Sequence, residues 1–353
     1  MTTARRKRLR FTRLVGIAST WTLPGVAFGQ DARPPISVFL STSVGLSPDD
    51  QRAVERGAVA THLLPSGVSR DISIVGILAI DVTRAAMVAY LGNTPSILRI
   101  PARRAFGIVR DSATPTDFDG VTLSARDAAA LRKCRPGSCA FKLSSSDMIR
   151  LRTLLTGSDD SVKAIRFQQR RLASIANGYR RSGNDAMPTY NDGSVGVRGA
   201  DAFASLHLES HLFDRFTPGL REYLDGYPRV HIAQARDILY WARDEPSGFQ
   251  PTTTLNHRIF YSIGGAGGVT IVARKQVVAD HYLDGALEVM VVVDRPAATG
   301  AGVYLMIMRQ YRFDQIPSTF RISLRGRLIA KLRERLESDL LRMKVSVTTP
   351  GGR

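Results

Sequence analysis

Residues 302–313 read GVYLMIMRQYRF and residues 324–343 read LRGRLIAKLRERLESDLLRM, and these two stretches decide the fold. The first is short and rich in apolar, β-branched and aromatic residues, which favours a buried strand. In the second, a leucine recurs every fourth residue from Leu328 to Leu340, so one side of a helix is apolar. The chain is therefore expected to end in a strand followed by a long amphipathic helix.

Several earlier stretches also have the composition of strands. Turn-forming residues separate apolar, β-branched and aromatic segments at 58–64, 72–82, 237–242, 252–263, 269–278 and 287–293. The segment 72–82 is nearly continuous in apolar residues, which predicts a buried, central strand. The segments 97–100 and 106–109 also resemble strands, whereas 83–90 has helical character.

The middle of the chain changes to helical periodicity. Ser124 with Asp127 resembles a capping box, much as Ser47 followed by Pro48 predicts the start of a short helix near the N-terminus. Further helices are expected at 144–155, 162–179, 201–216 and 220–224. We therefore expect a helical insertion at about 121–230 between two groups of strands.

This order of elements resembles the helix-grip proteins, the START-like superfamily of lipid carriers and polyketide cyclases. The resemblance covers roughly residues 55–110 and 236–345. It implies an α+β fold in which a curved antiparallel sheet packs on the long C-terminal helix, with an apolar cavity between them. The segments 134–139 and 280–288 are also similar to stretches of exported bacterial proteins.

The N-terminus has the order of an export signal. Six basic residues within 5–13 precede an apolar run over 14–28, and Ala27 and Gly29 fit a cleavage site before Gln30. The apolar run is too short and too polar for a comfortable bilayer span, which needs about 20 residues. We therefore expect residues 1–29 to be a cleaved signal peptide and residues 30–353 to form a single α+β domain in the periplasm or outside the cell. An uncleaved anchor is the alternative.

The net charge limits the choice of partners. The chain carries a formal charge of +18, and the six basic residues of the signal leave +12 for residues 30–353. A positive protein outside the cytoplasm favours anionic partners such as a phospholipid surface. Nucleic acid is a poor candidate once the chain is exported.

Cys134 and Cys139 flank a Pro-Gly turn. In an oxidising compartment this spacing predicts a disulfide. The alternative is a redox pair, because the neighbouring Lys133 and Arg135 would favour a thiolate.

Two histidine–aromatic pairs are the candidate ligand-binding residues. His257 and Tyr261 fall in the expected strand 252–263, and His281 and Tyr282 lie next to the strand region. Around a curved sheet, such side chains would offer polar contacts to an otherwise apolar ligand. Strand alternation places Asn256, Arg258 and Phe260 on one side of the sheet, and the odd-numbered His257, Ile259 and Tyr261 on the other.

His207 and His211 would share one side of a helix and could bind Zn²⁺ together with Asp214. Glu209 stands two residues from each histidine, so it does not occupy the position of a catalytic base in a zinc protease motif. Surface or core-edge histidines are the simpler interpretation, and we expect no metal site.

Other motifs do not lead to a catalytic site. The glycines at 264–268 precede a strand rather than a helix, which indicates a hairpin turn instead of a phosphate loop. Asp117 and Asp119 lack the remaining ligands of a calcium loop. There is no Gly-x-Ser-x-Gly motif. The sequence therefore indicates no catalytic residues and no cofactor.

Three functions are compatible with these patterns. The preferred one is an exported protein that binds or carries a hydrophobic small molecule or lipid in a cavity under the C-terminal helix. The second is a non-enzymatic envelope interaction protein that uses arginine-rich helix faces, such as the one around Arg166 and Arg170, to bind a partner or an anionic membrane surface. A metal-dependent enzyme is the third.

Overall fold

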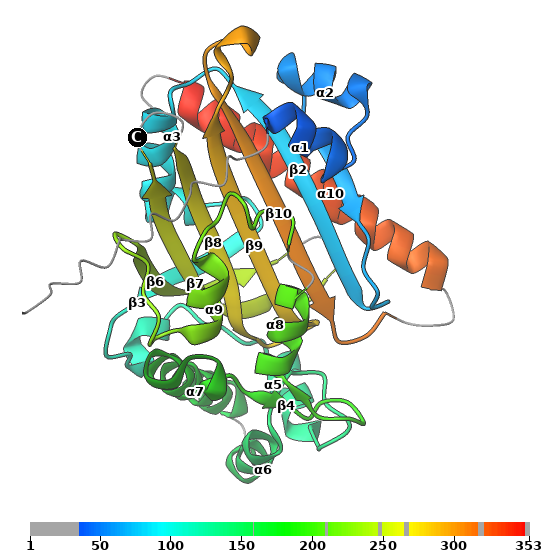
Figure 1. Ribbon diagram of the computed structural model, residues 1–353. Helices are drawn as coiled ribbons and strands as arrows, with labels where there is room; N and C mark the ends of the chain where they lie inside the picture. Colours follow the sequence, from blue (N-terminus) through cyan, green and yellow to red (C-terminus); the bar gives the residue numbers. More distant parts are fainter. Residues whose placement is uncertain are drawn as a thin grey trace, which may run out of the picture. The chain divides into compact units, whose positions relative to one another are not determined.

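The computed structural model describes residues 35–157, 159–208, 211–245, 249–264, 268–316 and 321–349. The proposed signal peptide, residues 1–29, lies outside the described residues. Eight strands form one antiparallel sheet in the order β1-β2-β10-β9-β8-β7-β6-β3 (Figure 1). With the long C-terminal helix, this confirms the predicted α+β class.

The eight strands are β1 (Ala60–Leu64), β2 (Asp71–Ile80), β3 (Arg103–Val109), β6 (Arg236–Asp244), β7 (Thr252–Ile263), β8 (Val269–Ala279), β9 (Leu283–Asp294) and β10 (Val303–Phe313). The short strands β4 (Thr189–Tyr190) and β5 (Val197–Arg198) pair separately. The α-helices are α1 (Ile36–Thr42), α2 (Pro48–Glu55), α3 (Arg84–Gly92), α4 (Thr94–Leu98), α5 (Ala125–Lys133), α6 (Ser145–Leu154), α7 (Asp160–Ser182), α8 (Gly199–Leu208), α9 (Leu220–Gly226) and α10 (Arg321–Thr348). Short 3₁₀ helices are η1 (Pro115–Phe118), η2 (Gly183–Ala186) and η3 (Ala297–Thr299).

The sheet is buried on both faces because helices cover each of them. Every residue of β2 is buried, as its continuous apolar sequence predicts. We call the face that carries Ile74, Gly76 and Leu78 the α10 face, since these residues belong to the core shared with α10 or contact that helix. The opposite face, which carries Val75 and Ile77, is called the insertion face.

Helices α3 and α10 cover the α10 face. Met87 and Leu91 of α3 and Leu336 and Leu340 of α10 pack in one apolar cluster with the strands. At Gly76 the contact is close: a Cβ atom there would lie 2.8 Å from Leu340 Cδ1 and 2.9 Å from Leu336 Cγ. The glycine therefore lets α10 lie directly on β2, and in Figure 1 the helix runs behind the sheet.

The insertion face is covered by residues from most of the remaining helices. Phe39 of α1, Tyr179 of α7, Phe203 of α8 and Leu224 of α9 pack against apolar side chains of the strands. In Figure 1, α8 and α9 lie in front of the sheet, on the side away from α10.

Several helices begin at the capping residues that the sequence predicts. The Ser47 and Ser124 side chains each accept a hydrogen bond from the backbone N–H of the third residue of their helix, which confirms both predicted caps. Of the two strand-like segments in the ambiguous region 95–110, 106–109 belongs to β3, whereas 97–100 is not a strand. Pro95 stands in the first turn of α4, and Asn93 Oδ1 accepts a hydrogen bond from Ser96 N at 3.3 Å, so this segment begins as a helix.

The predicted helix at 201–216 is also shorter than expected, because α8 ends at Leu208. Cys134 and Cys139 form the predicted disulfide. Within the part of the chain that the structure describes, none of the helices is both long and apolar enough to span a bilayer.

Candidate functional site

A row of charged side chains crosses the centre of the α10 face. On four neighbouring strands the residues directly opposite one another are Arg309 of β10, Glu288 of β9, Arg274 of β8 and Arg258 of β7. The residues on either side of this row are mostly apolar, for example Met290 and Val272. A charged row inside an apolar sheet face is costly unless its members are paired, so its partners decide what it can do.

One half of the row is fully paired. Arg309 Nε donates to Glu288 Oε2 at 2.5 Å, and its Nη2 donates to Asp339 Oδ2 of α10 at 2.8 Å. Arg342 Nη2 donates to the other oxygen of Asp339 at 2.9 Å. Burial alone would raise the pKa of Glu288, but the charges of Arg309 and Arg274 outweigh it and lower the pKa to about 2. Glu288 therefore stays ionised and ties α10 to the sheet through Arg309.

The other half is poorly paired. Arg274 donates from Nε to Glu288 Oε1 at 3.5 Å and from Nη1 to Asn256 Oδ1 at 3.4 Å, both at the long limit of a hydrogen bond. Arg258 bonds to the Leu91 carbonyl at 2.5 Å and to Thr94 Oγ1 at 3.2 Å, and it forms no ion pair with any described residue. Burial without a carboxylate partner lowers the pKa of Arg258.

An open hollow of about 760 Å³ lies at the β3 edge of the sheet. It is lined by Arg99, Ile100 and Pro101 from the α4–β3 segment, by the residues from Arg103 to Gly107, by residues in and after η1, by Trp241 of β6 and by Arg342 of α10. Its size falls in the range of small-molecule sites, roughly 300–1,000 Å³. The lining combines arginines with apolar and aromatic side chains.

One residue of the lining, Arg342, is linked to the charged row, and another, Arg103, lies beside Tyr240 of β6. Arg342 shares Asp339 with Arg309, as described above. Arg103 forms two bonds with Asp244, at 2.8 and 3.1 Å, and its Cζ lies 5.9 Å from the centre of the Tyr240 ring. Burial raises the pKa of Tyr240, and the charges of Arg274 and Arg103 oppose that rise.

We define the arginine cluster as Arg103, Arg258, Arg274, Arg309 and Arg342, together with the carboxylates of Asp244, Glu288 and Asp339. These eight residues carry two positive charges in excess. Such an arrangement can bind an anion through the guanidinium groups, while the apolar part of the hollow can contact a hydrocarbon group.

Two of the four predicted ligand-binding residues lie on the other side of the sheet. The structure confirms the predicted alternation of β7, and it places His257 and Tyr261 on the insertion face, each 1% exposed. His257 Nε2 lies 3.0 Å from Asp237 Oδ2, and its Nδ1 lies 3.1 Å from the Tyr179 hydroxyl. Burial lowers the pKa of His257, so the ring stays neutral between its two partners.

The other two predicted residues, His281 and Tyr282, lie in the β8–β9 turn. His281 Nδ1 is 2.8 Å from the Ala140 carbonyl, and the Tyr282 hydroxyl accepts a hydrogen bond from Gln250 N at 2.9 Å. The ring centres of His281 and Tyr282 lie 5.7 Å apart, and in the described structure neither residue forms a hydrogen bond or ring contact with His257 or Tyr261. Their role in ligand binding stays a prediction.

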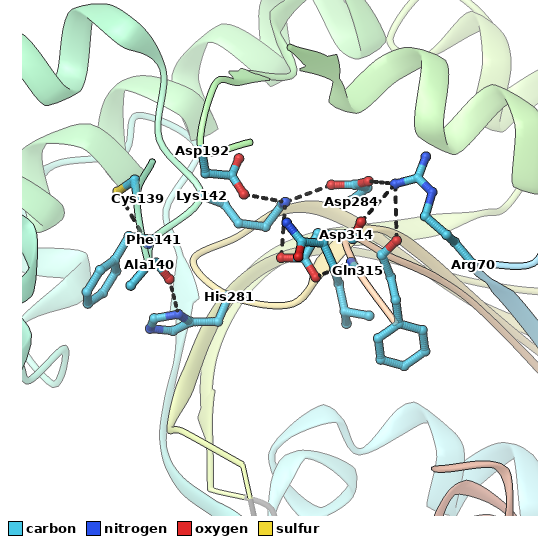
Figure 2. A network of polar contacts seen from close by, with 12 residues as sticks. Arg70, Cys139, Ala140, Phe141, Lys142, Asp192, His281, Asp284, Asp314 and Gln315 are labelled. Carbon is cyan, nitrogen blue, oxygen red and sulfur yellow. Dashed lines mark hydrogen bonds and ion pairs between the residues drawn. The ribbon is translucent and has the colours of Figure 1, made fainter. Parts of the chain in front are cut away.

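Beside His281, Lys142 is buried among three carboxylates (Figure 2). Its Nζ lies 2.7 Å from Asp284 Oδ1, 3.2 Å from Asp192 Oδ2 and 3.7 Å from Asp314 Oδ2. Arg70 Nη1 contacts the second oxygen of Asp284 at 2.9 Å. Burial alone would lower the pKa of Lys142, but Asp284 and Asp192 outweigh it and raise the pKa. This cluster joins the insertion to β9 and the end of β10.

The two histidines considered as a zinc pair, His207 and His211, have different partners. His207 Nδ1 lies 2.8 Å from Asp225 Oδ1, whereas His211 lies beyond the end of α8 and contacts Asp214 at 3.0 Å. Among the described residues, no group of three His, Cys, Asp or Glu side chains is placed to hold a metal ion.

The sequence-based prediction did not include the arginine cluster. A signal was nevertheless present: Arg274, Glu288 and Arg309 each interrupt a run of apolar strand residues. Their common alignment could not be predicted, because it depends on the register of strands that pair across turns of different length. Comparison of the chain with protein-family models and with curated proteins gave no match.

Proposed function

We propose that this protein is an exported carrier or binding protein for an amphipathic lipid-like molecule, which it holds in the hollow beside α10. The observation that carries this proposal is the pairing of that hollow with the arginine cluster, where Arg274 remains 24% exposed although it lies on the fifth of eight strands. A central arginine that solvent can reach marks a place where a polar group of a ligand can enter.

The arrangement of the helices supports a helix-grip interpretation. The chain forms a large antiparallel sheet, and both α3 and the long C-terminal α10 pack on the same face of it. The close contact at Gly76 leaves no room directly beneath Leu336 and Leu340. The ligand is therefore placed toward β3, where Phe106 and Trp241 line the hollow.

The proposal includes a location outside the cytoplasm. The basic, apolar and small-residue order of residues 1–29 supports export, and the disulfide between Cys134 and Cys139 is of a kind that persists in oxidising compartments. A periplasmic or extracellular location would bring the protein to envelope lipids and to other hydrophobic molecules outside the cytoplasm.

A second candidate is binding to an anionic membrane surface or an acidic partner. Arg166, Arg170 and Arg181 are exposed along α7, and none of them forms an ion pair with a described residue. Basic side chains near an anionic bilayer contribute about 1 kcal/mol each. This surface would serve delivery of a ligand as well as simple attachment.

Native mass spectrometry of the protein purified from the periplasm tests the carrier function. We expect a bound mass that disappears after organic extraction and is recovered as an amphipathic molecule in the extract. Protein that carries no adduct, and that takes up none after incubation with envelope lipids, would contradict the proposal. Association that requires only anionic vesicles and leaves no bound lipid would favour the second candidate.

A further inference from the structure

Resting on the proposed function, we infer that the ligand carries an anionic head group with equivalent oxygens, a carboxylate or a phosphate, and that Arg274 binds it. The inference concerns the chemical class of the ligand and the side chain that selects it. It depends on the unused donors of Arg274, on the local excess of positive charge and on the access to the sheet centre.

Arg274 has N–H donors that the hydrogen bonds of the described structure do not use. A guanidinium group offers five N–H donors in a planar fork. In the described structure, Arg274 uses two of them, at 3.4 and 3.5 Å. Arg309, on the same face, instead makes bonds of 2.5 and 2.8 Å to two carboxylates. Carboxylates thus pair closely with Arg309, whereas Arg274 can still accept a further hydrogen-bond acceptor as a partner.

A second positive charge lies beside Arg274. Arg258 lies directly opposite Arg274 on β7, and like charges at such positions destabilise a sheet. Glu288 is shared with Arg309, and Arg258 has only neutral partners. An anion bound to Arg274 would therefore offset a repulsion that the protein's own carboxylates leave in place.

Solvent reaches Arg274 more than it reaches the charged residues beside it. The neighbours of Arg274 on the α10 face are buried: Arg258 and Glu288 are each 6% exposed. The Arg274 side chain keeps 24% of its surface exposed, and its charge acts on Tyr240, whose ring centre lies 5.9 Å from Cζ of Arg103 in the lining of the hollow. A head group at Arg274 would leave the tail of the ligand to lie toward Phe106, which packs in one cluster with Tyr240, and toward Ile100 in the hollow.

The geometry also selects the type of anion. The parallel N–H groups of a guanidinium match two equivalent oxygens, which a carboxylate or a phosphate provides and an alcohol does not. A mutation that retains the charge but not the fork should therefore lose part of the preference, since lysine acts as a point charge.

Calorimetric titration with three probes of twelve-carbon chain length tests the inference: dodecanoate, dodecyl phosphate and dodecanol. We expect the wild-type protein to bind at least one of the two anions ten-fold or more tighter than the alcohol, and the affinities of the two anions identify the head group. Arg274→Gln should remove this preference while dodecanol binding is kept, and Arg274→Lys should retain part of it. Arg152→Gln, at an exposed position of α6, is the matched control and should bind as the wild type does.

A second variant tests the same inference if Arg274→Gln fails to fold. Asn256→Asp places a carboxylate where Arg274 already finds Asn256 Oδ1, so it should stabilise the fold and compete with the anionic probes. Equal binding of all three probes by the wild type and by Asn256→Asp would overturn the inference and leave the carrier function standing. Failure of the folded wild type to bind any of the probes, with no lipid recovered by mass spectrometry, would remove the carrier function itself.

Discussion

Lys275 shows what burial does to a single charge on the insertion face of the sheet. Its ammonium group bonds to Asn184 Oδ1 and to the Leu224 carbonyl, and it lies 3.8 Å above the centre of the Phe203 ring. It forms no ion pair within the described part of the chain. Burial lowers the pKa of Lys275 to about 7. The folded protein therefore releases a proton that the unfolded chain keeps up to its ordinary pKa of 10.5.

The sign of the resulting pH dependence follows from proton linkage. Between pH 7 and 10.5 the unfolded chain binds more protons at this position than the folded one, so stability rises with pH. We predict that the free energy of unfolding of the wild type increases between pH 7 and 9 relative to that of Lys275→Met, by up to about 1 kcal/mol per pH unit. Urea unfolding at several pH values measures this. Lys133→Met, at an exposed position, should follow the wild type, and parallel curves for wild type and Lys275→Met would contradict the prediction.

At the scale of elements, the Lys142 cluster fastens the insertion to the sheet. Lys142 lies between α5 and α6, and Asp192 lies between β4 and β5, whereas Asp284 belongs to β9. The same two segments of the insertion also meet through the backbone, where Gly137 N donates to the Asn191 carbonyl at 2.8 Å, inside the disulfide loop. The Lys142 ammonium group therefore connects two segments of the insertion to each other and to β9 of the sheet.

Removing that ammonium group leaves three carboxylates close together. Because breaking a buried ion pair from one side costs about 3–5 kcal/mol, we predict a loss of that size for Lys142→Met. The double variant Lys142→Met/Asp284→Asn removes one of the stranded charges and should recover part of the loss. Chemical unfolding of both variants and of Lys133→Met as a surface control measures the effect. An equal loss in the single and double variants would show that packing, and not charge, dominates here.

The sequence predicted the elements better than it predicted their contacts. The predicted strand at 252–263 and the predicted start of a strand at Val269 agree with β7 and β8, because turn-forming residues mark where these strands begin and end. The end of α8 was missed, since the residues after Leu208 continue a helical composition but bond elsewhere, for example His211 to Asp214. The signals for α2 and α5 were local caps, which need no knowledge of the rest of the chain.

The candidate site was harder to predict for a physical reason. Each charged residue of the arginine cluster stands in a different strand or helix, so its neighbours are set by register and by the way α10 lies on β2. The aromatic residues near His257 in the sequence made it a candidate for ligand binding. Strand alternation alone, however, does not predict on which face of the sheet His257 lies. The structure settles this through Asp237 and Tyr179, which come from β6 and α7.

For the whole described molecule, the two faces of the sheet differ in the kind of polar group that they bury. The α10 face holds arginines whose charge is retained at every ordinary pH. The insertion side holds bases whose charged form burial disfavours: the pKa of Lys275 falls to about 7, and burial also lowers the pKa of His257 and of His207 of α8. All three meet residues of the insertion, so the attachment of its helices is the part of the fold that should respond to acid.

His257 allows this response to be isolated. Its neutral ring contributes stability that is present above the ordinary pKa of 6.5 and is lost as the pH falls below it, because the unfolded chain then binds a proton that the folded one resists. We predict that acidification from pH 7.5 to 5.5 lowers hydrogen-exchange protection in α7 and α9 more than in α10, and that His257→Gln reduces this difference. Burial alone would raise the pKa of Asp237, but its hydrogen bonds to His257 and Tyr223 lower it. Asp237 therefore stays ionised throughout this pH range. Asp280 and Asp314, whose pKa burial raises, are present in both proteins and cancel in the comparison. Equal loss of protection in α7, α9 and α10 would mean that the sheet and both of its covering layers open as one unit, and that the buried bases of the insertion face give it no separate response to acid.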